Sequence, residues 1–136
     1  MLRTLIVEDE FTSRKILQAY LSPFGSCDIA VNGDEAIEAF AVALREGEPY
    51  RLVCLDINIP GKDGHQVCAA IRAFEEGSGV QGLDRAKVIM TSASSERGDI
   101  RSAFRVECDA YLIKPIDKGK LIQQMRELNL LDEFTF

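Results

Sequence analysis

The chain has 136 residues, of which 46% are hydrophobic, so it holds enough apolar material for one domain with a single buried core. Its 22 Asp and Glu residues outnumber its 16 Lys and Arg residues, which gives a net charge of −6. Surfaces that bind a nucleic-acid backbone gather Lys and Arg, so we expect no direct nucleic-acid binding. Every apolar run is shorter than a membrane span, so we expect no membrane association.

The four cysteines are scattered along the chain, and none belongs to a C-x-x-C pair. This spacing indicates neither a zinc site nor a disulfide framework. Cys54 lies inside an apolar run, where a buried free thiol is the simplest interpretation. We therefore expect a soluble cytoplasmic domain with reduced cysteines.

Strand-like and helix-like segments alternate along the chain. Short apolar runs predict strands, and these lie at residues 2–7, 27–31, 52–55, 88–90 and 111–113. A segment with helical spacing of apolar residues follows each strand, and the inward positions are, in chain order, Ile16, Leu17, Tyr20 and Leu21; Ile37, Phe40 and Leu44; Val67, Ile71 and Phe74; Ile100 and Phe104; and Leu121, Ile122, Met125 and Leu128. Pro23 and Gly25 end the first helix, Asn32 caps the second, and Gly77–Asp84 is expected to be an exposed loop.

Five such strand–helix units predict an α/β domain: a parallel sheet with helices on both faces, joined by right-handed crossovers. We see no second domain, so residues 1–136 are expected to form one. Ligands of such sheets bind beyond the carboxyl ends of the strands, near the point where the strand order reverses.

The residues at the strand ends are chemically unusual as a group. Glu8 and Asp9 follow the first strand and Asp56 ends the third, while Ser92 and Lys114 follow the fourth and fifth. Carboxylates brought together repel one another, so this arrangement requires a cation, and its oxygen ligands suit Mg²⁺. A carboxylate in such a site can also act as a nucleophile and form an aspartyl phosphate.

Four ordered segments carry a family resemblance. They are Leu5–Glu10, Asp56–Gly64, Val88–Ala93 and Ala110–Pro115. With them, essentially the whole chain resembles the receiver domain of bacterial response regulators, of the chemotaxis response regulator type. The resemblance implies a doubly wound (βα)5 fold with the flavodoxin-like strand order 2-1-3-4-5, and a role in two-component signalling.

The resemblance also implies the roles of the site residues. Asp56 would be the phosphoacceptor. It would receive a phosphoryl group from the histidine of a partner kinase or phosphotransfer protein, or from a small phosphodonor. Asp9 would bind Mg²⁺ directly, as would Asp56 and the main-chain carbonyl of Asn58, while Glu8 would bind it through water; Mn²⁺ is an alternative ion. Lys114 would pair with the phosphoryl oxygens.

Further roles concern switching. The family pattern places the switch hydroxyl at Ser92, with Thr91 as the fallback at a position that the family usually fills with an apolar residue. Tyr111 matches the aromatic switch position, and its movement would change the surface formed by the fourth helix, fifth strand and fifth helix. Asn58 and Ser94 match positions that tune the lifetime of the aspartyl phosphate.

The sequence departs from the family pattern at several places. Glu8 replaces the more usual Asp, and Ile59 stands where Met is common. Glu107 replaces a Gly at the end of the fourth helix, where a left-handed backbone is expected. The Gly77–Asp84 loop is longer than typical, and His65 is interpreted as incidental rather than as a phosphodonor.

Rival interpretations come from other classes. A flavodoxin-type electron carrier would need a phosphate cradle after the first strand, where Glu8 and Asp9 would repel the phosphate. An Asp-dependent phosphatase usually has a second acid two residues after the first, where this chain has Asn58. A docking module without phosphorylation, and a fragment of a longer response regulator or hybrid kinase, are further alternatives. We favour a stand-alone signalling switch rather than an enzyme, monomeric or weakly dimeric, with its downstream partner unidentified.

Overall fold

The computed structural model describes residues 2–93 and 97–131. A five-stranded sheet forms its centre, with the strands in the order β2-β1-β3-β4-β5 and every neighbouring pair parallel. The strands are β1 (Leu2–Val7), β2 (Gly25–Ala30), β3 (Leu52–Asp56), β4 (Lys87–Ser92) and β5 (Ala110–Ile113). This topology confirms the predicted flavodoxin-like fold.

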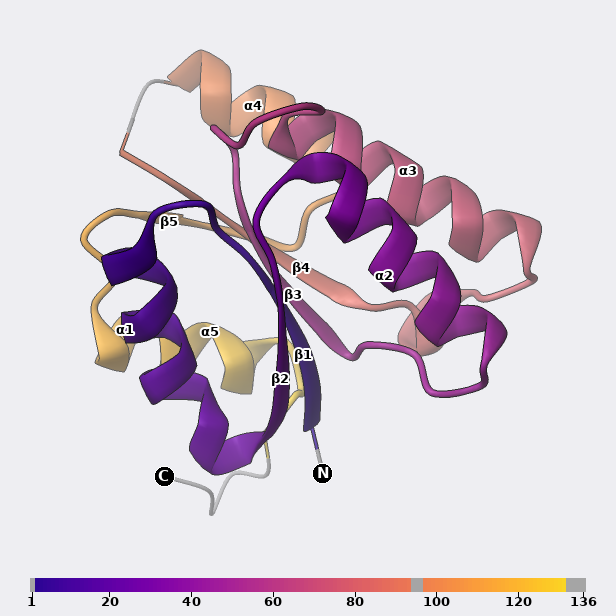
Figure 1. Cartoon of the computed structure of the whole chain (residues 1–136), viewed down its shortest axis with the longest axis horizontal. Helices are drawn as coiled ribbons and strands as arrows, with labels where there is room; N and C mark the ends of the chain where they lie inside the picture. Colours follow the sequence, from indigo (N-terminus) through magenta and orange to yellow (C-terminus); the bar gives the residue numbers. More distant parts are fainter. Residues whose placement is uncertain (1, 94–96, 132–136) are drawn as a thin grey trace.

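Five helices cover the two faces of this sheet. They are α1 (Phe11–Leu21), α2 (Gly33–Arg45), α3 (Gly64–Gly77), α4 (Arg97–Arg105) and α5 (Lys118–Glu127). Figure 1 shows α1 and α5 on one face, and α2, α3 and α4 on the other. Among the described residues, no helix combines the length and the apolar character that crossing a membrane requires.

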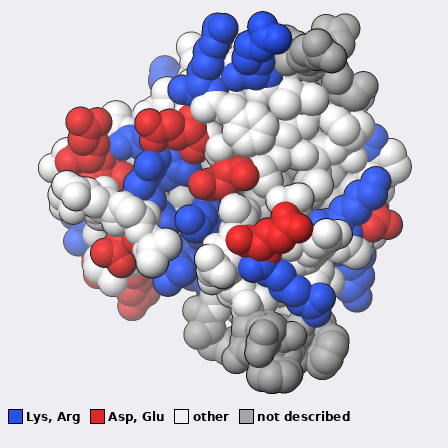
Figure 2. Space-filling view, turned by 180° about the vertical axis from the view of Figure 1, so that it is seen from behind, with Lys and Arg blue, Asp and Glu red and all other residues white. Residues whose placement is uncertain are grey.

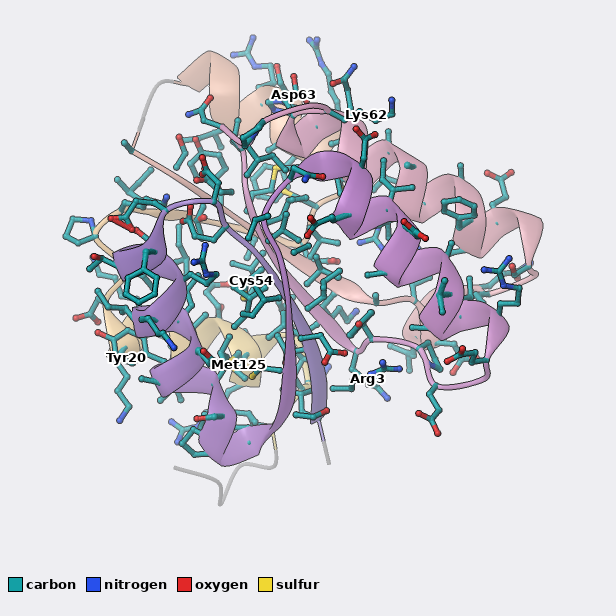
Figure 3. The ribbon with its side chains drawn as sticks, viewed as in Figure 1. Arg3, Tyr20, Cys54, Lys62, Asp63 and Met125 are labelled. Carbon is teal, nitrogen blue, oxygen red and sulfur yellow. The ribbon has the colours of Figure 1, made fainter. Side chains whose placement is uncertain are left out.

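The sheet divides the buried interior into two hydrophobic cores. The core beneath α1 and α5 contains Cys54 and Met125, and Figure 3 shows both on that side of the sheet. The core beneath α2, α3 and α4 contains Phe40 and Val67. All five residues of β3 are buried, because this central strand packs against both cores.

Side-chain caps explain where the helices begin. Asn32 accepts a hydrogen bond from the Glu35 amide at 2.8 Å, which confirms the predicted cap of α2. Asp63 forms a capping box with Gln66 at the start of α3, and Glu10 and Asp117 cap α1 and α5. The two loops that lead from β1 and β3 into helices therefore end at defined points beside the candidate site.

Several local expectations were wrong. Ile16, Phe74 and Phe104 were expected to face inward but are 41%, 40% and 49% exposed, because each lies at the margin of a helix whose buried face is narrower than its apolar face. The second strand begins at Gly25 rather than at residue 27, since its pairing with β1 extends to Leu2. The loop expected after α3 is largely exposed, as predicted, and it contains a 3-10 turn at Gly82–Asp84.

Candidate functional site

The carboxyl ends of β1, β3 and β5 bring four charged side chains together. Glu8 and Asp9 follow β1, Asp56 is the last residue of β3, and Lys114 follows β5. In Figure 3, the start of α3 lies at this upper end of the sheet, whereas Arg3 lies at the opposite end. The grouping expected from the sequence is therefore present in the structure.

Lys114 bridges two of the carboxylates. Its ammonium nitrogen Nζ lies 2.6 Å from Glu8 Oε1 and 2.9 Å from Asp56 Oδ2. Glu8 is fully buried and Asp56 is 5% exposed, so a single ammonium partly neutralises two carboxylates that have little contact with water. Buried charges are tolerated when they are paired in this way.

The pairing changes the acid–base behaviour of these groups. Burial raises the pKa of the Glu8 carboxyl; the hydrogen bond from Lys114 opposes this change, and the nearby Asp56 carboxylate adds to it. For Lys114, burial acts to lower the pKa, but the hydrogen bonds and charges of Glu8 and Asp56 outweigh it, so the pKa is raised. Lys114 therefore remains a cation at neutral pH.

Backbone contacts hold Asp56 in place. The Asn58 amide donates a hydrogen bond to Asp56 Oδ1 at 3.0 Å, and the Gly64 amide donates to the Ile57 carbonyl at 2.8 Å. A Cβ atom on Gly64 would lie only 2.7 Å from the Ile57 Cα and 2.9 Å from the Asp56 carbonyl oxygen. Glycine is therefore required where α3 begins, because the helix approaches the end of β3 so closely.

The three carboxylates can hold a cation. Glu8, Asp9 and Asp56 each offer one oxygen atom, and these oxygen atoms lie within 4.8 Å of one another. Asp9 is exposed, whereas the other two are buried, so the group is accessible from solvent at Asp9. Several hard oxygen ligands at this spacing fit a divalent cation such as Mg²⁺.

The sequence profile of the response regulator receiver domain matches residues 4–126. The chain belongs to this family. Its curated relatives include the transcriptional regulatory protein AruR of Pseudomonas aeruginosa, 31% identical over 93% of this chain, and the sensor protein GacS of Pseudomonas syringae, 32% identical over 89%. The receiver chain spans 48% of the first relative and 13% of the second, so these relatives are longer than this chain.

Solved structures resemble this receiver domain over nearly its whole length. The receiver domain of yeast Ssk1, crystallised with the histidine phosphotransfer protein Ypd1, is 26% identical, with a TM-score of 0.80; the alignment covers 98% of this chain and 94% of that one. A chain of the CheX–CheY–BeF3–Mg²⁺ complex from Borrelia burgdorferi is 25% identical, with a TM-score of 0.78 and coverage of 96% and 90%.

The two neighbouring hydroxyls of the receiver domain lie on opposite sides of β4. Ser92 follows Met90, whose side chain joins the core beneath α2, α3 and α4, and Met90 is the register partner of Tyr111. Ser92 and the half-buried Tyr111 therefore share one face of the sheet. Thr91 lies on the opposite face and pairs in register with Asp56. Ser94, the remaining predicted residue, lies outside the described residues.

One contact of the site was not predicted from the sequence. The Arg14 guanidinium, on α1, donates hydrogen bonds to the main-chain carbonyls of Glu8 and Asp9, each at 3.3 Å. These contacts tie the acidic loop to the helix that follows it. The sequence places Arg14 on the polar face of α1, which is compatible with this contact but does not specify it.

Proposed function

We propose that this receiver domain is a phosphoacceptor switch. In a magnesium-dependent reaction, Asp56 takes a phosphoryl group from the histidine of a partner kinase, from a phosphotransfer protein or from a small phosphodonor. Phosphorylation then changes a partner-binding surface on α4, β5 and α5. The observation that carries this proposal is the bridge from the Lys114 ammonium to both buried carboxylates, Glu8 and Asp56.

The proposed metal ligands are Asp9, Asp56 and the main-chain carbonyl of Asn58, with Glu8 binding through a water molecule. The three carboxylates are close enough to share one ion, and the Borrelia complex, which was crystallised with Mg²⁺, supports the choice of metal. When bound, Mg²⁺, or Mn²⁺ as an alternative, supplies positive charge for the phosphoryl oxygens.

The residues of the chain then have separate tasks. A carboxylate oxygen of Asp56 attacks phosphorus while the phosphorus–nitrogen bond of the donor breaks, and the electron pair of that bond stays on the imidazole. Lys114 stabilises the charge on the phosphoryl oxygens, because its ammonium already lies 2.9 Å from Asp56 Oδ2. The Ser92 hydroxyl donates a hydrogen bond to the transferred group.

Ser92 couples phosphorylation to the surface. When it moves toward the phosphoryl group, space opens on the face that it shares with Tyr111, and the tyrosine ring turns inward. Tyr111 lies on β5 beside Ile113, which is 40% exposed, and α4 contributes Phe104, which is 49% exposed. Figure 2 shows a largely uncharged stretch over β5, between α4 and α5, where a partner would bind.

A second surface fits the phosphodonor protein. A hollow of about 160 Å³ adjoins the site, and its lining includes Ile16, Tyr20 and Pro115 beside Glu8 and Lys114. An apolar side chain next to the donor histidine would fill this hollow and bring the histidine to Asp56. The yeast complex of a receiver domain with Ypd1 supports a phosphotransfer protein as one such donor.

The proposal also covers the extent of the domain, its oligomeric state, the lifetime of the aspartyl phosphate and the location of the protein. Residues 1–136 are taken as one receiver domain, working alone or within a longer response regulator or hybrid kinase, as a monomer or weak dimer. Asn58 and Ser94 set the lifetime of the aspartyl phosphate, because their small polar side chains leave room for an attacking water molecule. The four cysteines are free thiols, which supports a cytoplasmic location.

Incubation with Mg²⁺ and acetyl phosphate tests the proposal. The unmodified chain is expected to gain the mass of one phosphoryl group, which hydroxylamine removes, and Asp56→Asn is expected to gain none. Asp34→Asn is the matched control, because Asp34 lies at the same end of the sheet and, among the described residues, its carboxylate forms only an exposed ion pair with Lys62 at 3.7 Å. Stoichiometric labelling of Asp56→Asn would refute the assignment, and an unlabelled native chain would favour a docking module.

A further inference from the structure

Thr91 carries a buried hydroxyl with no hydrogen-bond partner among the described residues. The residue is 1% exposed, so bulk water does not reach the hydroxyl. A buried, unsatisfied hydroxyl costs about 1–3 kcal/mol, and valine would fill the same volume without this cost. A hydroxyl at this position therefore calls for an explanation beyond packing.

The sheet register places Thr91 on β4, between the strand that Lys114 follows and the strand of the Asp56 carboxylate that Lys114 contacts. Thr91 is the register partner of Asp56 on β3 and of Leu112 on β5, and β4 lies between these two strands. The Lys114 amide is hydrogen-bonded to β4, yet its ammonium reaches Asp56 on β3 and Glu8 beyond it. The lysine side chain must therefore pass over the end of β4.

Strand alternation puts Thr91 on the same side as this lysine. Ile89 and Leu112 belong to the core beneath α1 and α5, and residues two positions apart on a strand share a face. Thr91 and Lys114 are two residues beyond Ile89 and Leu112, respectively. The unpartnered hydroxyl and the lysine that crosses β4 thus lie on one face.

A divalent cation at Glu8, Asp9 and Asp56 would share two of these carboxylates with the Lys114 ammonium. Lys114 has three N–H donors, and two of them are used on Glu8 and Asp56. A doubly charged cation bound at these carboxylates would repel the ammonium and compete with it for the carboxylate oxygen atoms. The displaced donor then needs another acceptor, because an unpaired N–H in a partly buried site is costly.

We propose that Thr91 is a positioning residue for Lys114. Its hydroxyl oxygen accepts a hydrogen bond from the Lys114 ammonium once a divalent cation occupies the carboxylates. The lysine is then held close to Asp56, where phosphoryl oxygens arrive, instead of swinging into solvent. This inference rests on the proposed function, and it extends that function to a position where the family resemblance predicts an apolar residue.

The test compares Thr91→Val, which removes the hydroxyl at nearly constant volume, with Thr91→Ser, which keeps it. Mg²⁺ affinity of the full chain is measured by isothermal titration calorimetry. Thr91→Val is expected to bind Mg²⁺ about fivefold more weakly, the factor expected for one lost hydrogen bond, whereas Thr91→Ser stays close to the native affinity. Without metal, Thr91→Val is expected to unfold at the native temperature or above it.

Two results would overturn the inference. One is an equal Mg²⁺ affinity of Thr91→Val and the native chain, and the other is an equal loss in Thr91→Ser, which would assign the effect to the missing methyl group. Thr91→Ala repeats the comparison, so the conclusion does not depend on how well valine fits. Calorimetry needs no phosphorylation, so a native chain that binds Mg²⁺ but takes no phosphoryl group would contradict the proposed function and leave this inference standing.

Discussion

Tyr50 combines burial with a neighbouring carboxylate, at the end of the sheet opposite the candidate site. Its hydroxyl donates a hydrogen bond to Asp28 Oδ2 at 2.7 Å, and the Arg3 guanidinium carbon lies 4.5 Å from the ring centre. Burial, followed by the hydrogen bond and charge of Asp28, raises the pKa of Tyr50 to about 12. The protonated phenol therefore helps to hold β1, β2 and β3 together at this end of the sheet.

The titration of Tyr50 tests this arrangement. Because the folded pKa is above the unfolded value of about 10, the stability from this group is complete below pH 10 and is lost as the pH rises through about 12. Phenolate absorbance, taken as the difference between the native chain and Tyr50→Phe, is expected to show the raised pKa. Asp28→Asn should lower it, and an ordinary pKa in the native chain would contradict the assignment.

The junction between α4 and β5 is held by a network of ion pairs. Glu107, just after α4, has a φ angle of 64°, which confirms the left-handed backbone expected there. Arg72 of α3 donates two hydrogen bonds to the Glu107 carbonyl and one to Asp109, and it also pairs with the buried Glu75. Arg85 pairs with the Glu107 carboxylate.

Figure 2 shows charged side chains of both signs crowded on its left side, toward the end of α3. These contacts maintain a conformation that glycine adopts more easily.

Two substitutions at Glu107 isolate the contribution of the left-handed backbone to the stability of the fold. Both Glu107→Ala and Glu107→Gly remove the carboxylate, so they differ only in the cost of the left-handed conformation. Glu107→Gly is expected to be about 1 kcal/mol more stable than Glu107→Ala in urea unfolding, the reverse of their order inside a helix. Equal stabilities would show that the junction changes conformation when the carboxylate is lost.

Across the whole molecule, buried thiols are distributed over both cores. Cys54 lies in the core beneath α1 and α5, while Cys68 and Cys108 lie in the core on the other face. Burial raises the pKa of Cys54 and Cys68 to about 12 and that of Cys108 to about 11. Only the thiolate reacts with common thiol reagents. These three thiols are therefore protected both by their burial, which keeps reagents away, and by their raised pKa, which keeps them protonated.

Thiol labelling therefore reports how the two cores open. Under native conditions, only the half-buried Cys27 is expected to react promptly, and the other three should react together when denaturant unfolds the chain. The number of labelled thiols is counted by intact mass, with Cys27→Ser as the control that removes the early reaction. Early labelling of Cys68 or Cys108 alone would indicate that the core beneath α3 opens separately.

The sequence by itself was sufficient for the features that depend on local patterns. Apolar runs and helical spacing predicted the alternating elements, because residue periodicity follows from the geometry of a strand or a helix. The cap at Asn32 was predictable for the same local reason, whereas the left-handed backbone of Glu107 was expected only from the family pattern. Parallel strands align their carboxyl ends, so Glu8, Asp56 and Lys114 could be expected to meet.

Only the tertiary structure decided how these residues pair. The bond from Lys114 to Glu8 joins residues 106 positions apart, and it depends on β3 and β4 lying between the first and fifth strands. The same strand order and register place the unpartnered Thr91 hydroxyl on the face that Lys114 crosses. Periodicity shows which side of a strand a residue occupies, but a contact across several strands depends on how the whole chain folds.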